Sequence, residues 1–359
     1  MTDSNSGASP RWMSAGKLIP IVKLCVKLGI AVALIAWVVG EDGRAMLESI
    51  RRMNPLWVLC CFLALLAQMT GTAVRWKFLI SKELNVSFYE AFRLTAIGLF
   101  ANIFIPAGAV GGDVVKATLL ASKTGKGKRV DATVSILVDR IVGMAGLFLL
   151  TLVLFLIFLR RILELPSAVR FLVFCLTLLC VAGLLVTIVL FFQDFIFRWK
   201  FAAKLLAFAD RWMRGIPGSV VRSVSAYRSR WRVLFWTTFF STFLLHPLLM
   251  LAMFFPLYGE LHTLPDPGTT MTSVAYGSVA AAIPLTPGGV GTRDAVIKTL
   301  LSSWGVAESS AATAMILYTS LLLLIDLFAG IAFFLPEKWE NLRICRSVSG
   351  IGRREARKK

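Results

Sequence analysis

Six stretches of mostly apolar residues, each long enough to cross a bilayer, dominate this chain. They lie at residues 18–40, 56–79, 132–159, 171–192, 233–258 and 307–335. About twenty residues of α-helix are needed to cross roughly 30 Å of hydrocarbon, because each residue adds about 1.5 Å. Hydrophobic residues make up 57% of the chain and charged residues only 16%, a balance that excludes an ordinary soluble domain. The sequence therefore predicts an all-α, polytopic membrane protein with six full spans.

Two further apolar segments share a motif and are interrupted by Pro and Gly. PAGAVGGDVVKATLL runs from residue 106 to 120, and PGGVGTRDAVIKTLL runs from residue 287 to 301. In both, an Asp follows the Pro by seven residues, and a Val and a Thr-Leu-Leu follow that Asp at matching spacings. The breaks leave arms of roughly ten apolar residues, too short to cross the bilayer singly. We expect two re-entrant helical hairpins, which are the usual sequence sign of a transporter's substrate site.

The positions of Lys and Arg predict the orientation of the chain. They concentrate before the first span or in its early turns, at 123–129, at 198–232 and at 338–359, whereas the loop at 259–268 has none. The positive-inside rule then places both termini in the cytoplasm, with the spans in the cytoplasmic (inner) membrane. In that orientation the hairpins enter from opposite sides, so residues of about 17–160 and 168–335 form a pseudo-symmetric inverted repeat. The alternative is an ordinary duplicated bundle in which Gly and Pro serve only helix packing.

We expect a single membrane domain over residues 17–335, between a polar cytoplasmic tail (1–16) and a basic cytoplasmic tail (336–359). Residues 193–232 interleave aromatic side chains with Arg and Lys, as in amphipathic segments that lie on an anionic cytoplasmic leaflet. The adjacent spans favour lipid over nucleic acid as the partner of this segment. The sequence holds no metal-binding Cys/His spacing and no nucleotide-binding or nucleophile motif, so we predict no metal, cofactor or catalytic residue.

Candidate substrate-binding residues gather around the two breaks. Backbone N–H groups at a broken helix need a partner, and glycine lets them come close to an anion such as phosphate. The candidates at the first hairpin and in the third span are Asn102, Pro106, Gly108, Gly111, Gly112, Asp113, Lys116, Asp139 and Arg140. Those at the second hairpin are Pro284, Pro287, Gly288, Gly289, Gly291, Arg293 and Asp294. Each hairpin thus offers a cation beside a carboxylate, although each carboxylate would also serve as a helix cap.

Four other ionisable residues in apolar segments are secondary candidates, because charge inside a membrane is costly and marks function by default. Arg75 ends the second span, where snorkelling to the interface is the simpler explanation. Arg93 lies in the ingoing arm of the first hairpin, and Asp326 lies in the sixth span. His246 is in mid-span before a Pro, where it would either make a packing hydrogen bond or act in a proton relay.

Three segments together resemble a known family: NIFIPAGAVGGD (102–113), PLTPGGVGTRD (284–294) and DRIVG (139–143). They are similar to the lysylphosphatidylglycerol synthase transmembrane-region family, a flippase-like family once also called dolichol-phosphate-glucose synthetase-like. The resemblance covers nearly the whole chain and implies movement of aminoacylated phosphatidylglycerol or other lipids between leaflets. The soluble aminoacyl transferase domain of the full-length synthases is not expected here, since about 24 residues follow the last span.

These features predict a flippase-like transporter that moves an anionic phospholipid or a lipid-linked phosphate between membrane leaflets. Two alternatives stay open. One is a membrane-embedded glycosyl- or acyl-lipid enzyme that uses a carboxylate at Asp113, Asp139 or Asp294. The other is a non-transporting accessory subunit of a lipid-synthesis complex. The expected partners are a membrane lipid with an anionic head group and, among proteins, a second copy of the chain or lipid-synthesis enzymes.

Overall fold

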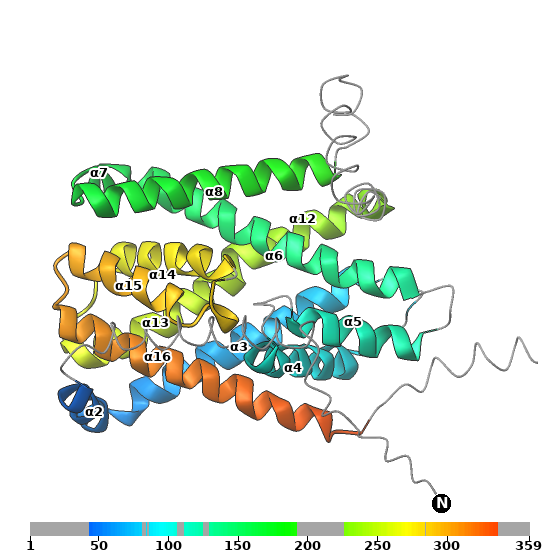
Figure 1. The fold of residues 1–359 in the computed structure, drawn as a ribbon, viewed down its shortest axis with the longest axis horizontal. Helices are drawn as coiled ribbons and strands as arrows, with labels where there is room; N and C mark the ends of the chain where they lie inside the picture. Colours follow the sequence, from blue (N-terminus) through cyan, green and yellow to red (C-terminus); the bar gives the residue numbers. More distant parts are fainter. Residues whose placement is uncertain are drawn as a thin grey trace, which may run out of the picture.

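A computed structural model describes residues 43–80, 84, 86–105, 111–124, 129–191, 226–283 and 285–336. Over these residues the chain is helical and contains no strand (Figure 1). The first predicted span, both predicted tails apart from Pro336, and most of the basic segment at 193–232 lie outside the described residues. The same holds for the candidate site residues Pro106, Gly108 and Pro284.

Five helical stretches in the described part of the chain are long and apolar enough to cross a membrane. They are α3 (Pro55–Leu79), α6 (Arg129–Ile157), α8 (Ser167–Phe191), the stretch Tyr227–Leu261 and the stretch Glu308–Phe333. They lie where the sequence predicts the second to sixth spans. The chain is therefore a multi-pass membrane protein, and a sixth span at 18–40 stays a prediction.

The stretch Tyr227–Leu261 changes its winding in the middle. It comprises most of η4 (Ala226–Arg230), then α12 (Trp231–Phe240), the π-helical turn η5 (Ser241–Leu245) and α13 (His246–Leu261). The His246 N–H donates to the Ser241 carbonyl five residues back, as in a π-turn. Because Pro247 has no N–H to continue the α-helical bonds, a widened turn at this place is physically reasonable. The turn packs against α6.

Two helix pairs broken at Pro and Gly are the next feature. The first pairs α4 (Phe88–Phe104) with α5 (Gly111–Lys123), and the second pairs α14 (Pro267–Ala282) with α15 (Thr292–Ser303) through the short turn η6 (Pro287–Gly289). The arms have 17 and 13 residues and 16 and 12 residues, so the expected length of roughly ten was too short. Every arm still falls short of the twenty residues or so that a span needs.

The two pairs lie toward opposite ends of the bundle, with their broken ends facing its middle (Figure 1). There η6 of the second pair contacts α4 of the first. Each pair is wrapped by long helices, since α6 packs against both α5 and α14. Re-entry of these pairs into a membrane, and an inverted repeat, stay predictions.

Three other described helices complete the chain's path. The short helices α2 (Gly43–Arg52) and α7 (Leu159–Leu163) occupy predicted loops, and α2 packs against α16 (Glu308–Ala329). The turn η7 (Gly330–Phe333) continues α16 and contacts α4. Both short helices carry Arg and lie at the same end of the bundle (Figure 1).

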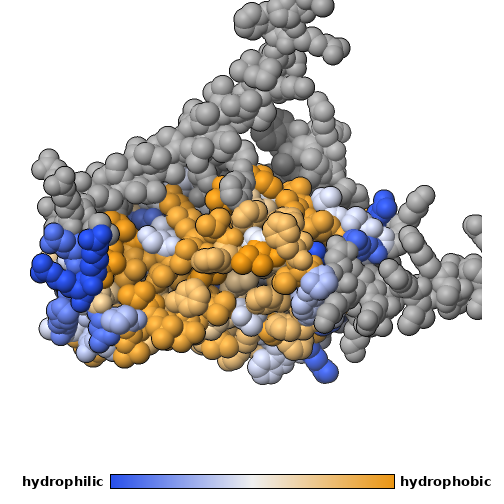
Figure 2. All heavy atoms as spheres, turned by 90° about the horizontal axis from the view of Figure 1, so that it is seen from below, coloured by the Kyte–Doolittle hydropathy of each residue, from blue (hydrophilic) through white to orange (hydrophobic). Residues whose placement is uncertain are grey.

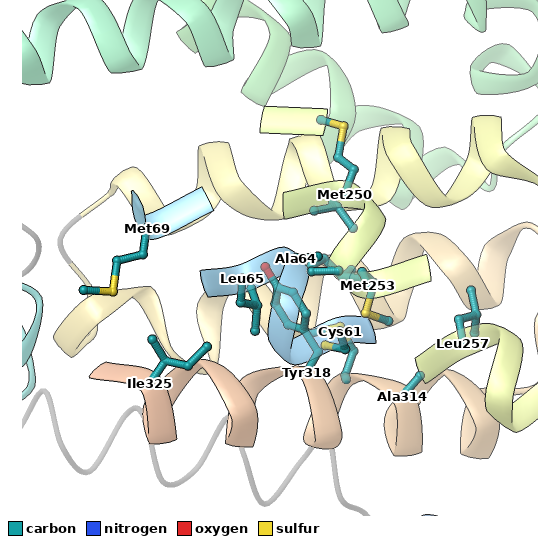
Figure 3. Close-up of a cluster of buried hydrophobic side chains, with 14 of the residues drawn as sticks. Cys61, Ala64, Leu65, Met69, Met250, Met253, Leu257, Ala314, Tyr318 and Ile325 are labelled. Carbon is teal, nitrogen blue, oxygen red and sulfur yellow. The ribbon is translucent and has the colours of Figure 1, made fainter. Parts of the chain in front are cut away.

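The core joins helices that are far apart in the sequence. Cys61 of α3, Met253 of α13 and Tyr318 of α16 are all fully buried in one cluster (Figure 3). Unbranched Met side chains fill irregular space between such helices, and Met69 and Met250 extend the same cluster. On the outside, apolar side chains form a broad surface between more polar ends (Figure 2), as a bilayer requires.

Candidate functional site

A buried ion pair joins α3 to α6. Arg75 Nε and Nη2 donate to the two carboxylate oxygens of Asp139 at 2.9 and 3.2 Å, and Arg75 Nη1 donates to Ser241 Oγ at 2.9 Å. Both side chains are only 8% exposed. A Cβ at Gly143 would lie 2.8 Å from Arg75 Nη1, so the guanidinium rests against bare backbone of α6. The expectation that Arg75 snorkels is wrong, because the chain folds a carboxylate into its reach.

A second bidentate pair joins α6 to the outgoing arm of the first helix pair. Arg140 Nη2 donates to Asp113 Oδ1 at 3.0 Å, and Arg140 Nε donates to Asp113 Oδ2. These side chains are more accessible than the first pair, at 41% for Arg140 and 16% for Asp113. Consecutive residues of α6, Asp139 and Arg140, thus hold two different helices. One pair is sealed in the core and the other lies at its edge.

Lys116 is the one cation of this region without a carboxylate partner among the described residues. Its side chain lies in the core, with the residue 4% exposed, and its Nζ stands 3.4 Å from the centroid of the Trp76 ring. Trp76 Nε1 is likewise buried and has no hydrogen-bond partner. The sequence offers Lys116 as a cation beside Asp113, but Asp113 pairs with Arg140 while Lys116 lies over the Trp76 ring of α3.

Together these residues form what we call the first charge cluster: Arg75, Asp113, Lys116, Asp139 and Arg140. The other four charges act on the Lys116 ammonium, so all five groups lie close together. Three cations and two carboxylates leave a charge of 3 − 2 = +1. An unbalanced buried charge is costly unless an anion or a set of hydrogen bonds compensates it.

The start of α5 is held by side-chain and backbone contacts within the first helix pair. The Gly112 N–H donates to Asn102 Oδ1 at 2.7 Å, and both residues are buried. A Cβ on Gly112 would lie 1.9 Å from the Gly98 carbonyl oxygen, so only glycine lets α4 and α5 approach this closely. Gly111, also buried, begins α5. Asn102 therefore satisfies one freed N–H from within the protein.

The second helix pair has its own buried ion pair, which further hydrogen bonds support. Arg293 Nε donates to Asp294 Oδ1 at 3.1 Å, and Arg293 Nη2 donates to Thr319 Oγ1 at 2.9 Å. Thr319 Oγ1 in turn donates to Asp294 Oδ1 at 2.8 Å, and the Gly291 N–H donates to Asp294 Oδ2 at 3.1 Å. Asp294 is thus both the cap of α15, as considered from the sequence, and the partner of Arg293.

The turn before α15 depends on glycine. Pro287 opens η6, and Gly288, Gly289 and Gly291 all have positive φ, at 59°, 74° and 85°. Gly289 is also enclosed, since a Cβ there would lie 2.4 Å from the Ala281 Cβ. L-residues with side chains rarely adopt such angles, so these glycines let α14 and α15 pack as a pair.

The remaining secondary candidates make structural contacts or stand apart from the first charge cluster. Arg93 donates to the Ala332 carbonyl at 3.1 Å and to Glu90, tying α4 to η7. The His246 ring contacts the Gly143 carbonyl at 3.0 Å, the packing hydrogen bond considered from the sequence. Asp326 is half-buried in α16 and lies close enough to Arg293 for an electrostatic attraction between the two side chains.

Three residues that complete these contacts were not among the candidates predicted from the sequence: Trp76, Ser241 and Thr319. Trp76 carried a weak signal, since it adjoins Arg75 at the end of an apolar span. Ser241 and Thr319 carried none, because hydroxyl residues inside a helix usually bond to their own backbone. Their roles depend on packing between distant helices.

The fold and its interior define a class: a multi-pass helical membrane protein with charged side chains gathered inside the bundle. The chain belongs to the family described as the lysylphosphatidylglycerol synthase transmembrane region, whose sequence profile matches residues 24–330. The match confirms the resemblance seen in the sequence and assigns the protein to membrane lipid metabolism or transport, with membrane lipids as partners. A comparison with curated protein sequences found no match.

Proposed function

We propose that this protein binds a lipid with an anionic, phosphate-containing head group inside its helical bundle and moves that lipid between the leaflets of the cytoplasmic membrane. The observation that carries the proposal is the buried Lys116 ammonium, which has no carboxylate partner in the described part of the chain and sits in a cluster of net charge +1. One phosphodiester anion neutralises that cluster.

The chemistry of the first charge cluster suits a phosphate. An ammonium is a compact charge with three N–H donors, and it binds phosphate oxygens without a fixed direction. Inside a low-dielectric bundle such contacts are stronger than in water, which offsets the cost of removing the anion from its hydration shell. The acyl chains would stay against the apolar outer surface (Figure 2).

The arrangement of the two helix pairs supports movement over static binding. Broken helices that approach from opposite ends and meet inside a bundle are the architecture of alternating-access carriers. Here η6 of the second helix pair contacts α4 of the first, so movement of one pair would displace the other. Membership of a family linked to membrane lipids points the same way. Cytoplasmic termini and a re-entrant, inverted arrangement of the pairs are part of this proposal.

The test is transfer of labelled lipid in vesicles that contain the purified full chain. Lys116→Met should reduce transfer of phosphatidylglycerol to about a tenth, the effect of losing about 1.4 kcal/mol of binding, and reduce transfer of zwitterionic phosphatidylcholine much less. Lys298→Met is the matched control, because Lys298 is equally buried on α15 but pairs with Glu308 at 2.7 Å. It should lower stability and leave the lipid preference unchanged. An unchanged preference in folded Lys116→Met would overturn the proposal.

A second arm separates a lipid from a soluble phosphate. Glycerol 3-phosphate, which carries the head-group charge without acyl chains, should compete only weakly with phosphatidylglycerol. Because the acyl chains contribute apolar contacts with the bilayer and the bundle, the lipid keeps the advantage. Equal competition would make the ligand a soluble phosphate and would contradict lipid transport.

A further inference from the structure

We infer that the Arg140–Asp113 ion pair is displaceable: the lipid phosphate takes the place of the Asp113 carboxylate on Arg140 and frees α5 from α6. The inference rests on the proposed function, since it concerns how the same anionic head group reaches Lys116. In this inference the Arg75–Asp139 pair stays closed, whereas the Arg140–Asp113 pair opens when the lipid binds.

The contacts of the two pairs differ in the way this exchange requires. The Arg75–Asp139 pair is 8% exposed on both sides, and Ser241 takes a further donor of the guanidinium. An incoming anion would have to break three hydrogen bonds in the core to reach Arg75. The Arg140 side chain is 41% exposed, so an anion displaces less of the protein there than it would at Arg75.

Geometry along α5 connects Arg140 to Lys116. Asp113 and Lys116 are three residues apart on this helix, so their side chains are neighbours on one face. An anion that replaces Asp113 on Arg140 therefore stands next to the Lys116 ammonium and is shared by two cations. Guanidinium binds phosphate in the same bidentate way as carboxylate, which makes the exchange conservative at Arg140.

The exchange has a structural consequence. The Arg140–Asp113 pair is an ionic link between α5 and α6. With Asp113 displaced, the start of α5 keeps its contact with Asn102 of α4 but loses this ionic link to α6. Head-group binding is thereby coupled to release of the first helix pair from α6, which a carrier needs in order to change its accessible side.

The test compares two neutralised carboxylates in the full chain, using short-chain phosphatidylglycerol as the probe. Asp113→Asn removes the internal competitor for Arg140 and should tighten binding about tenfold. Asp139→Asn, the matched control, changes the cluster charge by the same amount but leaves Arg75 enclosed, so it should not tighten binding. Weaker or unchanged binding by Asp113→Asn overturns the exchange. Equal tightening by both variants also overturns it, because the effect would then come from net charge alone.

A measurement on the unchanged protein covers the case in which a variant fails to fold. Amide hydrogen exchange over 111–123 should be faster with phosphatidylglycerol than with phosphatidylcholine, because the ionic link to α6 is lost. Equal or slower exchange overturns the inference. If Lys116→Met abolishes the lipid preference but Asp113→Asn does not tighten binding, the exchange fails and the proposed function stands. If Lys116→Met keeps the preference, the proposed function itself fails.

Discussion

The Lys116 Nζ lies 3.4 Å from the centroid of the Trp76 ring, in a place where the lysine is 4% exposed. A desolvated cation–π contact contributes about 2 kcal/mol, less than the several kcal/mol that burial of an ammonium costs. The ring therefore holds the flexible lysine in position but does not compensate its charge. This imbalance strengthens the case for Lys116 as an anion-binding residue, which its place in the repeated Pro/Gly segment had only suggested.

Substitutions of Trp76 test this positioning role. Trp76→Phe keeps an aromatic face under Lys116 and removes the unpartnered Nε1, so phosphatidylglycerol binding should stay within about threefold of the unchanged protein. Trp76→Leu removes the face and should weaken binding by about three- to thirtyfold, the equivalent of about 0.7–2 kcal/mol. Titration of the detergent-solubilised protein with short-chain phosphatidylglycerol measures both. Equal binding by the two variants would show that the ring does not position Lys116.

The sealed pair between α3 and α6 predicts strong coupling in stability. Arg75→Met or Asp139→Leu alone leaves a buried charge without its partner and should cost about 3 to 5 kcal/mol of unfolding free energy. The double variant removes both charges and should recover most of that loss. A double-mutant cycle from unfolding in mixed micelles gives the coupling energy. Additive losses would mean that the two side chains do not depend on each other.

Much of the fold could be predicted because long apolar runs have few ways to fold in a membrane. Each of the spans expected after residue 55 appears as a helix at its predicted place. The helix α2 was missed because its polar ten-residue sequence carries no span signal. The arms of the helix pairs proved longer than expected, since polar and small residues such as those of α14 also continue a helix.

The candidate site was only partly predictable. Charged residues inside apolar segments were visible, but their partners were not, because Arg75 and Asp139 are 64 residues apart and meet only through packing. Sequence spacing suggested that Lys116 pairs with Asp113, whereas Asp113 pairs with Arg140 of α6 and Lys116 lies over the Trp76 ring of α3. The Arg293–Asp294 pair was predictable, since its members are adjacent in the chain.

Close packing at Gly112 predicts a large effect of a single methyl group. A Cβ there would lie 1.9 Å from the Gly98 carbonyl oxygen, and backbone cannot move aside as a side chain can. Gly112→Ala should force α4 and α5 apart and lower stability by about 1–3 kcal/mol or more. Gly305→Ala is the control, because a Cβ there meets nothing within 4 Å and costs only the strain of φ 89°. Thermal unfolding of both variants decides whether contact or backbone strain dominates.

The proposed orientation predicts which side of the membrane two loops of the chain face. A reporter fused after Lys128 should be cytoplasmic, and one placed at Asp266 should be external, because basic residues gather around the former and are absent from the latter's loop. Arg161 runs against that rule, but it pairs with Asp266 at the end of the bundle that we propose is external. An external signal from Lys128 would reverse the orientation and remove the proposed sides of both helix pairs.

The contacts of Arg293 predict that the second helix pair is pinned and does not bind the head group. Arg293 donates to Asp294 and Thr319, Asp294 also accepts from Thr319 and from the Gly291 N–H, and Arg293 is 5% exposed. Arg293→Gln should therefore lower the unfolding temperature and leave the preference for phosphatidylglycerol over phosphatidylcholine unchanged. Lys116→Gln should raise the unfolding temperature and remove that preference. Loss of Arg293 leaves the buried Asp294 carboxylate without its partner, which costs stability. Loss of the Lys116 ammonium removes the cost of burying a cation that has no carboxylate partner among the described residues, and it also removes an anion contact. Thermal unfolding and lipid competition, measured on both variants, check the two effects separately. A lost lipid preference in folded Arg293→Gln would place the phosphate between both helix pairs.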